Sequence, residues 1–227
     1  MAKSRSKRYK EAAKLLDINK SYSLKEAVAL LKKFPGTKFD QTVEVNLHTS
    51  IDPKKSDQLI RGTVSLPHGT GRKVRIAVFC KGEQEKEAKA AGADFVGAED
   101  LIEKVNNGFL DFDAAVASPD IMKDLSRLGK ILGPRGLMPS PKTGTVTQNV
   151  SAAVRDIKGG KIEFKVDKQS GIHAGIGKIN FTEDQILENA SKVIEAITHA
   201  KPASVKGNFI KSVSISCSMG PGIKVAL

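Results

Sequence analysis

The segment Leu132–Gly144 contains residue types that could bind a phosphate group. A loop that cradles a nucleotide phosphate needs a glycine before a Lys-Ser/Thr pair, because its backbone amides must wrap the phosphate oxygens. Here Pro141 precedes Lys142 and Thr143, and proline has no amide hydrogen to donate. The pattern therefore excludes a nucleoside triphosphate site. It leaves an RNA contact through Arg135 and Lys142 or a stiff structural loop, and it favours the structural loop.

Other catalytic and metal-binding patterns are also missing from the sequence. The turn Cys80–Glu83 lacks the glycine spacing of a dinucleotide site. Asp111 and Asp113 precede an apolar run and are more typical of a turn than of a catalytic pair. The histidines are His48, His68, His173 and His199, and their spacing is not that of metal ligands. We expect no enzyme, no cofactor and no metal; the rival hypothesis is an enzyme whose middle segment binds a nucleotide or small substrate.

Polar side chains alternate with apolar ones along three predicted strands and would line one face of a sheet. Small hydroxyls and mixed charges let a sugar-phosphate backbone approach closely and form hydrogen bonds to its 2′-hydroxyls and phosphates. The sequence has no Trp and two Tyr, which argues against a platform of stacked aromatic rings. An RNA-binding face is the functional interpretation, and an ordinary solvated face is the alternative. The rows are Thr42, Glu44 and Asn46; Lys161, Glu163 and Lys165; and Ser214, Ser216 and Ser218.

A glycine-rich turn, Ser218–Gly222, directly follows the last predicted strand. Its glycines expose backbone amides, and Met219 offers an adaptable apolar surface to a sugar or a base. A plain turn near the end of the chain is the alternative interpretation of the same residues.

The composition favours a polyanionic partner. The chain has 227 residues, with 37 Lys and Arg against 25 Asp and Glu, a net charge of +12 and a pI near 9.6. Nucleic acid is the first candidate partner, and an anionic membrane surface is a distant second. The basic N-terminus precedes no apolar run, and no stretch reaches the roughly 18 to 20 apolar residues of a membrane span. Cys80 and Cys217 lie far apart, which indicates a reducing compartment. We expect a cytoplasmic protein with no membrane partner.

Two kinds of hydrophobic pattern predict two domains, one α+β and one α/β. The outer segments combine alternating strands with amphipathic helices that open on capping boxes at Ser23 and Thr182. We expect the strands at 161–166 and 172–179 to form a hairpin. In the middle, mostly apolar strands alternate with helices, which is typical of a parallel sheet covered on both faces. The middle strands are expected at 74–79, 94–96 and 112–117, and the helices at 82–91, 99–107 and 119–128.

We therefore predict a discontinuous α+β domain from residues 1–67 and 160–227, with an α/β domain inserted at 68–159. The outer segments carry +10 of the +12 net charge, which makes the split domain the better candidate for binding a polyanion. Joints rich in glycine and proline flank the insertion. Their residues are Pro67, Gly69 and Gly71 on one side and Gly159 and Gly160 on the other.

Four separated motifs resemble the family of large-subunit ribosomal protein one, the protein of the mobile stalk beside the E site. They are GTVSLPHGTG at 62–71, AAGAD at 90–94, ILGPRGLMP at 131–139 and SMGP at 218–221, in the family's order. The resemblance covers essentially the whole chain. It implies a split RNA-binding domain with a Rossmann-like insertion, and together with the composition of the joints it predicts a hinge between the domains.

The resemblance also implies what the protein binds. Its expected partners are the stalk region of 23S rRNA in the large ribosomal subunit, the E-site tRNA whose release it assists, and its own operon mRNA, whose translation it represses. We expect a monomer when the protein is free. A further hypothesis is a repressor that does not reside on the ribosome. The sequence does not separate it from the ribosomal protein, because one surface could serve both RNAs.

Residues that match the family's RNA contacts fall in three parts of the chain. We expect the three lysines to contact phosphates and set the register of the RNA. We expect Thr42, Glu44, Ser218 and Met219 to read the shape of a folded RNA. Ser218 stands where the family usually has threonine, so the hydroxyl is kept and a methyl contact is lost. The matching residues are Lys38, Phe39, Thr42 and Glu44; Lys165, Asp167 and Lys168; and Ser218, Met219 and Gly220.

Overall fold

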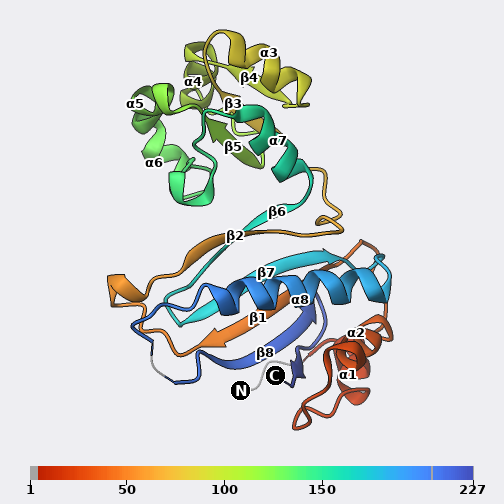
Figure 1. Ribbon diagram of the computed structural model, residues 1–227. Coiled ribbons are helices and arrows are strands. Elements are labelled where there is room, and N and C mark those ends of the chain that lie inside the picture. Colours follow the sequence, from red (N-terminus) through yellow and green to blue (C-terminus); the bar gives the residue numbers. More distant parts are fainter. Residues whose placement is uncertain (1–4, 206, 227) are drawn as a thin grey trace. The chain divides into compact units, whose positions relative to one another are not determined.

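The computed structural model describes residues 5–205 and 207–226 and contains two compact units. Unit 1 comprises Met1–Gly71 and Ile162–Leu227, and unit 2 comprises Arg72–Lys161. The chain passes between the units at 71/72 and 161/162, whereas the boundaries predicted from the sequence are 67/68 and 159/160. The mixed α/β fold class predicted from the sequence is confirmed, since each unit has its own sheets and helices (Figure 1).

Unit 1 is built on a four-stranded antiparallel sheet with the order β7-β1-β8-β9, which we call the main sheet. Val43, Val45 and Leu47 of β1 are at most 2% exposed and alternate with half-buried polar residues, as the sequence predicts. These apolar side chains share one core with helices α2 (Leu24–Lys32) and α8 (Glu183–His199), which cover one face of the sheet (Figure 1). The strands are β1 (Thr42–Thr49), β7 (Gly171–Lys178), β8 (Ile210–Cys217) and β9 (Ile223–Val225).

Both covering helices begin at the predicted capping boxes. The Ser23 hydroxyl accepts from the Glu26 amide at 3.3 Å, and the Glu26 carboxylate accepts from the Ser23 amide at 3.0 Å. Thr182 and Gln185 form the same reciprocal pair at the start of α8. An N-cap of this kind is worth about 0.5–2 kcal/mol, and it sets the residue at which the helix starts. A shorter helix, α1 (Lys7–Lys14), was not predicted and is capped by Ser6.

The strand that follows the insertion does not pair as predicted. Strand β6 (Lys161–Lys165) forms a separate two-stranded sheet with β2 (Arg61–Ser65), which lies after a 3-10 turn at Ser56–Gln58. The expected hairpin with β7 is reduced to an isolated bridge between Val166 and Ile172. The row of Lys161, Glu163 and Lys165 therefore does not lie on the main sheet, and our placement of it there is wrong.

Glycine at position 62 explains this pairing. The Phe164 ring of β6 is 3% exposed and packs directly on the backbone of β2, where a Cβ on Gly62 would lie 2.7 Å from the ring. The Val166 amide also donates to the Ile60 carbonyl at 3.1 Å. Alternation predicts a strand but not its neighbour, so the choice between β2 and β7 depends on this contact.

Unit 2 is a three-layer α/β structure. Its parallel sheet has the order β4-β3-β5, and β3 is buried on both faces, which explains its continuous apolar run. One apolar cluster packs α3 (Glu83–Ala90) and α7 (Val150–Lys158) on the sheet, and a second packs α4 (Glu99–Asn106), α5 (Met122–Leu125) and α6 (Gly129–Leu132). The strands are β3 (Ile76–Phe79), β4 (Phe95–Gly97) and β5 (Ala114–Ala117).

Two parts of unit 2 differ from the prediction. The expected helix at 119–128 is a succession of short pieces, with 3-10 turns at Pro119–Ile121 and Ser126–Leu128 around α5. The Ser126 hydroxyl donates to the Lys123 carbonyl at 2.6 Å and so competes with regular helix bonding. Helix α7 was missed, although its buried residues have helical spacing and the Asn149 side chain caps its start.

The first joint is fixed to unit 1 by a buried asparagine. Asn189 of α8 is fully buried, and its amide nitrogen donates to the carbonyls of Gly69 at 3.0 Å and Ile176 at 2.7 Å. Its side-chain oxygen accepts from the His68 amide at 3.2 Å. The same helix that covers the sheet therefore holds the chain just before it leaves unit 1.

Among the helices of the described residues, none is long and apolar enough to cross a membrane.

Replacing Asn189 with alanine should lower the free energy of unfolding of unit 1 by about 3 kcal/mol, because it leaves buried backbone groups without partners. Both tyrosines, Tyr9 and Tyr22, lie in unit 1, so tyrosine fluorescence during urea unfolding reports on this unit. The exposed Asn208→Ala is the matched control and should change stability by less than about 0.5 kcal/mol. Equal effects of the two substitutions would contradict the assigned role.

Candidate RNA interface

The face of the main sheet opposite α2 and α8 carries small and polar side chains, and we call it the polar sheet face. The register places Glu44 between Gly175 and Ser216 on the neighbouring strands. Glycine and serine leave the strand backbones open to close approach by another backbone. The residues of this face are Glu44, Asn46 and His48 on β1, Gly171, His173 and Gly175 on β7, and Ser212, Ser214 and Ser216 on β8.

A chain of polar contacts crosses this face from β8 to the turn before β7. The Asn46 amide nitrogen donates to the Ser216 hydroxyl at 3.1 Å. The Asn46 side-chain oxygen lies 2.7 Å from His173 Nδ1 and can accept its hydrogen. His173 Nε2 lies 3.4 Å from an oxygen of Asp167. These contacts orient four polar side chains across three strands, so the face presents a fixed pattern of donors and acceptors.

The segment Ser218–Gly220, which we call the tip, is held by the start of β1. The Ser218 amide donates to the Thr42 carbonyl at 3.1 Å, and the Thr42 amide donates to the Ser218 hydroxyl at 3.1 Å. The Met219 amide donates to the side-chain oxygen of Gln41 at 3.1 Å. The backbone of Met219 is fixed in this way, and the residue is 51% exposed.

Gly220 permits the close packing beneath the tip. A Cβ at this position would lie 2.5 Å from the Cys217 sulfur and 3.1 Å from the Phe34 ring. Burial raises the pKa of the Cys217 thiol, so this side chain serves as a small apolar group under the turn. A larger residue than glycine would therefore displace the tip.

Two predicted contact residues precede β1 in a loop next to the tip. Phe39 is 52% exposed, and its carbonyl accepts a hydrogen bond from the Thr37 hydroxyl at 2.7 Å. Lys38 is exposed. The Thr42 hydroxyl accepts from the Lys178 ammonium at 3.0 Å, which adds a cation to this end of the sheet.

Asp167 organises the turn at the opposite end of β1. One oxygen of its carboxylate accepts from the amides of Gly171 at 2.7 Å and Gln169 at 2.8 Å. These bonds, led by the one from Gly171, lower the pKa of Asp167. The same turn contains Ser170 at φ +65°, whose carbonyl accepts from the Thr49 amide at 2.9 Å. Asp167 therefore fixes the turn that carries the exposed Lys168.

The structure sorts the predicted contact residues into two groups at the two ends of β1. Thr42 and His48 mark the ends of the polar row between the groups, and a strand of that length spans about 20 Å. The polar sheet face lies between them. One group is Lys38, Phe39, Thr42, Glu44, Ser218, Met219 and Gly220. The other is Asp167 and Lys168 in the turn before β7, with Lys165 just before them at the end of β6.

Three residues of this surface were missed in the sequence analysis as parts of a site. Gln41 and Lys178 adjoin Thr42, and His173 joins Asn46 to Asp167. Strand alternation alone assigns Lys178 to the buried row of Ala174 and Ile176. An irregularity in the pairing of β7 with β1 between Val43 and Glu44 brings Lys178 beside Thr42, so alternation does not indicate this contact. The contact between Gln41 and Met219 joins positions 178 residues apart, so a local pattern does not indicate it.

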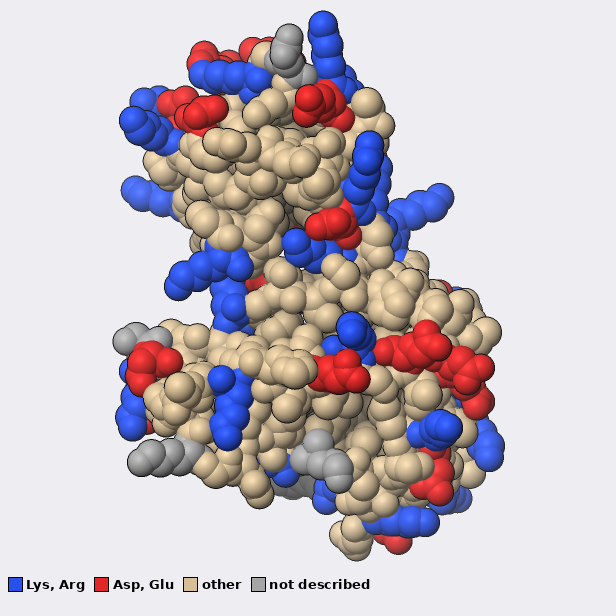
Figure 2. Space-filling view, in the orientation of Figure 1, with Lys and Arg blue, Asp and Glu red and all other residues tan. Residues whose placement is uncertain are grey.

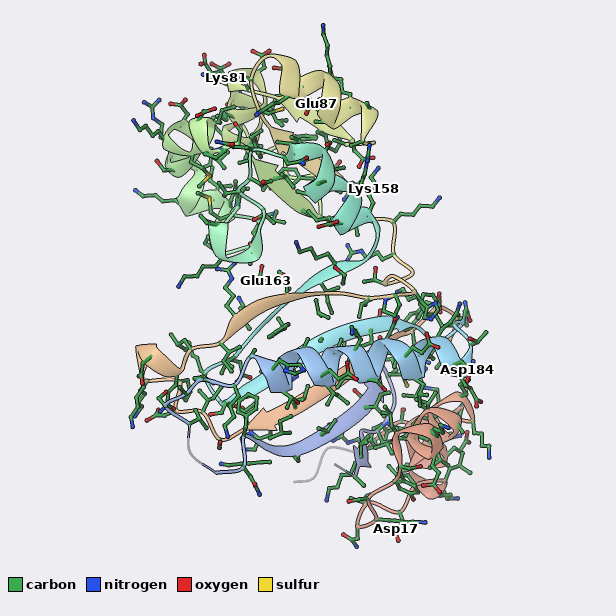
Figure 3. All side chains as sticks on the ribbon, viewed as in Figure 1. Asp17, Lys81, Glu87, Lys158, Glu163 and Asp184 are labelled. Atoms are coloured by element: carbon green, nitrogen blue, oxygen red, sulfur yellow. The ribbon has the colours of Figure 1, made fainter. Side chains whose placement is uncertain are left out.

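The helical side of unit 1 is unsuited to a polyanion. The outer surface of α8 bears the exposed Glu183, Asp184, Glu188 and Glu195, against the exposed Lys192. Figure 2 shows acidic side chains gathered over the start of this helix, where Figure 3 labels Asp184. Such a surface repels a phosphate backbone. A nucleic acid should therefore approach unit 1 from the polar sheet face.

The described side chains of unit 2 form neither a reactive thiol nor an open phosphate-binding loop. Cys80 follows β3, and burial raises the pKa of its thiol to about 11, so it stays protonated near neutral pH. In the loop at 132–144, the buried Thr143 donates to the Ser140 carbonyl at 3.0 Å and contacts the Thr145 hydroxyl at 2.9 Å. The polar groups of this loop therefore form hydrogen bonds with one another. Within residues 5–205 and 207–226, no three His, Cys, Asp or Glu side chains are grouped to hold a metal ion.

Replacing Asp167 with alanine should destabilise unit 1 at neutral pH, because the turn loses its amide acceptors. The folded-state pKa of Asp167 lies below the unfolded value of about 3.9, so its contribution is present above that value. The contribution is lost as the pH falls through the folded-state pKa. Urea midpoints followed by tyrosine fluorescence should therefore differ at pH 7 and converge in acid. A difference that stays constant with pH would contradict this role.

Comparison with known proteins supports the resemblance seen in the motifs. The model of the "Ribosomal protein L1p/L10e family" matches residues 31–221. A Thermosipho melanesiensis protein named "Large ribosomal subunit protein uL1" is 58% identical over 221 residues, covering 97% of this chain and 95% of the relative. Proteins of the same name from Protochlamydia amoebophila and Thermobifida fusca are 54% and 53% identical, over 98% and 97% of this chain and 94% of each relative.

These matches extend over nearly the whole chain, including both units. The family consists of structural, non-enzymatic ribosomal proteins, which confirms our expectation that the protein is not an enzyme. The family match and the relatives of more than 50% identity, together with an open polar sheet face and a fixed tip, establish that the chain belongs to the ribosomal protein L1p/L10e family.

Proposed function

We propose that this protein is a constituent of the large ribosomal subunit that binds the mobile-stalk region of 23S rRNA through the polar sheet face and its two ends. The observation that carries the proposal is the pairing of Thr42 with Ser218, 176 positions apart, which joins the loop before β1 to the tip. Family membership and the names of the relatives support the ribosomal location in the cytoplasm.

The residues at the two ends would divide the work of binding. Lys38 at one end, and Lys165 and Lys168 at the other, would contact phosphates and set the register of the RNA. Thr42, Glu44, Ser218 and Met219 would read the shape of a folded RNA and its 2′-hydroxyls. Asp167 would act mainly by holding the turn that carries Lys168, because its carboxylate is already engaged by backbone amides.

Substituting Lys165 with alanine should flatten the dependence of rRNA affinity on salt. Each phosphate contact contributes about one unit to the slope of log affinity against log salt concentration, so the slope should fall by about one. The measurement is binding of the purified protein to a stalk-region rRNA fragment across a salt series. Lys192→Ala on the acidic surface of α8 is the matched control and should leave the slope unchanged.

The companion substitution Met219→Ala should weaken binding roughly tenfold at an unchanged salt slope. Burying the exposed half of a methionine side chain is worth about 1–1.5 kcal/mol and involves no counterion release. If the fragment binds no better than random RNA, or if neither Lys165 nor Met219 matters, the proposed interface is wrong.

We further propose that the same interface represses translation of the protein's own operon by binding its mRNA. One polar face with two lysine-bearing ends would serve both RNAs if they share a fold. Lys165→Ala and Met219→Ala should then weaken the binding of an mRNA leader fragment and the binding of the rRNA fragment in parallel. Loss of rRNA binding with full retention of mRNA binding would refute a shared interface.

A hinge between the units would let the protein assist release of E-site tRNA, acting as a monomer when free. Its residues would be Pro67, Gly69, Gly71, Gly159 and Gly160. Gly69, Gly71 and Gly160 have φ values of +64°, +68° and +102°, which glycine adopts without strain. Because Asn189 holds His68 and Gly69 to unit 1, we expect the movement within this set at Gly71, Gly159 and Gly160, and not at Pro67 or Gly69.

Energy transfer between dyes in the two units tests this hinge. We expect different distance distributions in free and rRNA-bound protein, and identical distributions would contradict the hinge. Ribosomes that lack the protein should also release deacylated tRNA from the E site more slowly than ribosomes that contain it. Equal release rates would contradict the proposed role in tRNA release.

A further inference from the structure

A pocket of about 330 Å³ opens between the end of α2, the loop before β1 and the end of β7. Leu31, Phe34 and Ile179 supply its apolar lining, and Lys38 and Phe39 stand at its rim. Its volume lies at the small end of the range for ligand sites in proteins, about 300–1,000 Å³. The pocket therefore suits a small flat group better than a folded peptide.

Gln41 lines this pocket and has unused hydrogen-bonding capacity. The residue is 5% exposed, and its side-chain oxygen accepts from the Met219 amide at 3.1 Å. Because a backbone amide can only donate, the oxygen of the Gln41 side chain must face the tip and the nitrogen must face elsewhere. Among the residues that the structure describes, that nitrogen has no hydrogen-bond acceptor. The nitrogen is not among the fully enclosed polar atoms that lack a partner, so it is reachable from outside the protein and can donate to a ligand that supplies an acceptor.

The pocket and the tip are physically continuous. Gly220 of the tip packs on the Phe34 ring, whose side chain also lines the pocket. Gln41 likewise contacts Met219 and lines the pocket. An RNA strand that passes over the tip would therefore bring its unpaired bases to the mouth of this pocket, beside the positive charge of Lys38.

We propose that this pocket takes one unpaired base of the RNA bound at the tip, with a ring carbonyl of the base accepting from the Gln41 amide nitrogen. The inference rests on the proposed RNA-binding function. Proteins commonly recognise RNA by taking splayed-out bases against aromatic and apolar side chains and by hydrogen bonding to their edges. The half-exposed Phe39 ring is placed at the rim to stack on such a base. Guanine, uracil and cytosine have the required carbonyl.

The experiment combines an abasic scan of the RNA with a substitution in the pocket. Each unpaired nucleotide of the stalk-region rRNA fragment is replaced in turn by an abasic one, and affinity is measured for the wild type and for Gln41→Glu. Glutamate keeps an oxygen for the Met219 amide and loses the amide donors. Gln148→Glu, at an exposed position in unit 2, adds the same charge away from the pocket and serves as the matched control.

The pocket predicts one nucleotide at which loss of the base weakens wild-type and Gln148→Glu binding about tenfold and has little further effect in Gln41→Glu. Thermal unfolding verifies that Gln41→Glu is folded. If Gln41→Glu is not folded, Gln41→Met, which also lacks the amide donors, is used in its place. If base loss and the substitution are additive at every nucleotide, the inference is overturned. Tight, salt-dependent binding by the wild type would then still uphold the proposed function, whereas absence of specific binding would overturn both.

Discussion

Strand β1 carries hydrogen bonds along both of its edges, and the arrangement of unit 1 depends on these two registers. One edge pairs with β7 and the other with β8, so residues near position 45 meet residues near 174 and 215. A shift of one residue would bring Glu44 and Asn46 into the core and expose Val43 and Val45. Burial of the apolar row thereby fixes the register, and the register fixes which polar side chains share the open face.

The same packing separates the surfaces of unit 1 by charge. Helices α2 and α8 bury the apolar side of the sheet, and α8 turns its acidic residues outward (Figure 2). The side of the sheet that remains open is rich in glycine, serine and amide groups, with lysines at its ends. Backbone and side-chain hydrogen bonds hold the tip and the turn at Asp167. Binding RNA there would require little reordering of the protein, which favours affinity.

Much of this organisation follows from local sequence patterns. The alternation of β1 and the capping boxes at Ser23 and Thr182 are local signals, and the structure confirms each of them. The neighbour of β6 depends on a contact between Gly62 and Phe164, about a hundred positions apart, which alternation does not encode. The short pieces around α5 reflect competition between serine hydroxyls and helix bonding, and helix α7 had a recognisable pattern that was missed.

The candidate site was predictable to a similar degree. Family motifs and strand periodicity identify the tip and the polar row of β1, because their residues are close in sequence to strong signals. The roles of Gln41 and His173 arise from contacts across the sheet. The structure also gives Asp167 a role in its own turn that a motif match does not reveal.

The central claim is that RNA binds unit 1 at the polar sheet face and the tip. The most direct test is NMR of the protein with labelled methionine methyl groups, titrated with the stalk-region rRNA fragment. Met219 lies at the tip, whereas Met122 and Met138 belong to the apolar cluster around α4, α5 and α6 in unit 2. We expect the Met219 signal to shift or broaden until the RNA saturates the protein, while Met122 and Met138 stay in place. A Met219 signal that is unchanged at saturation would contradict the account.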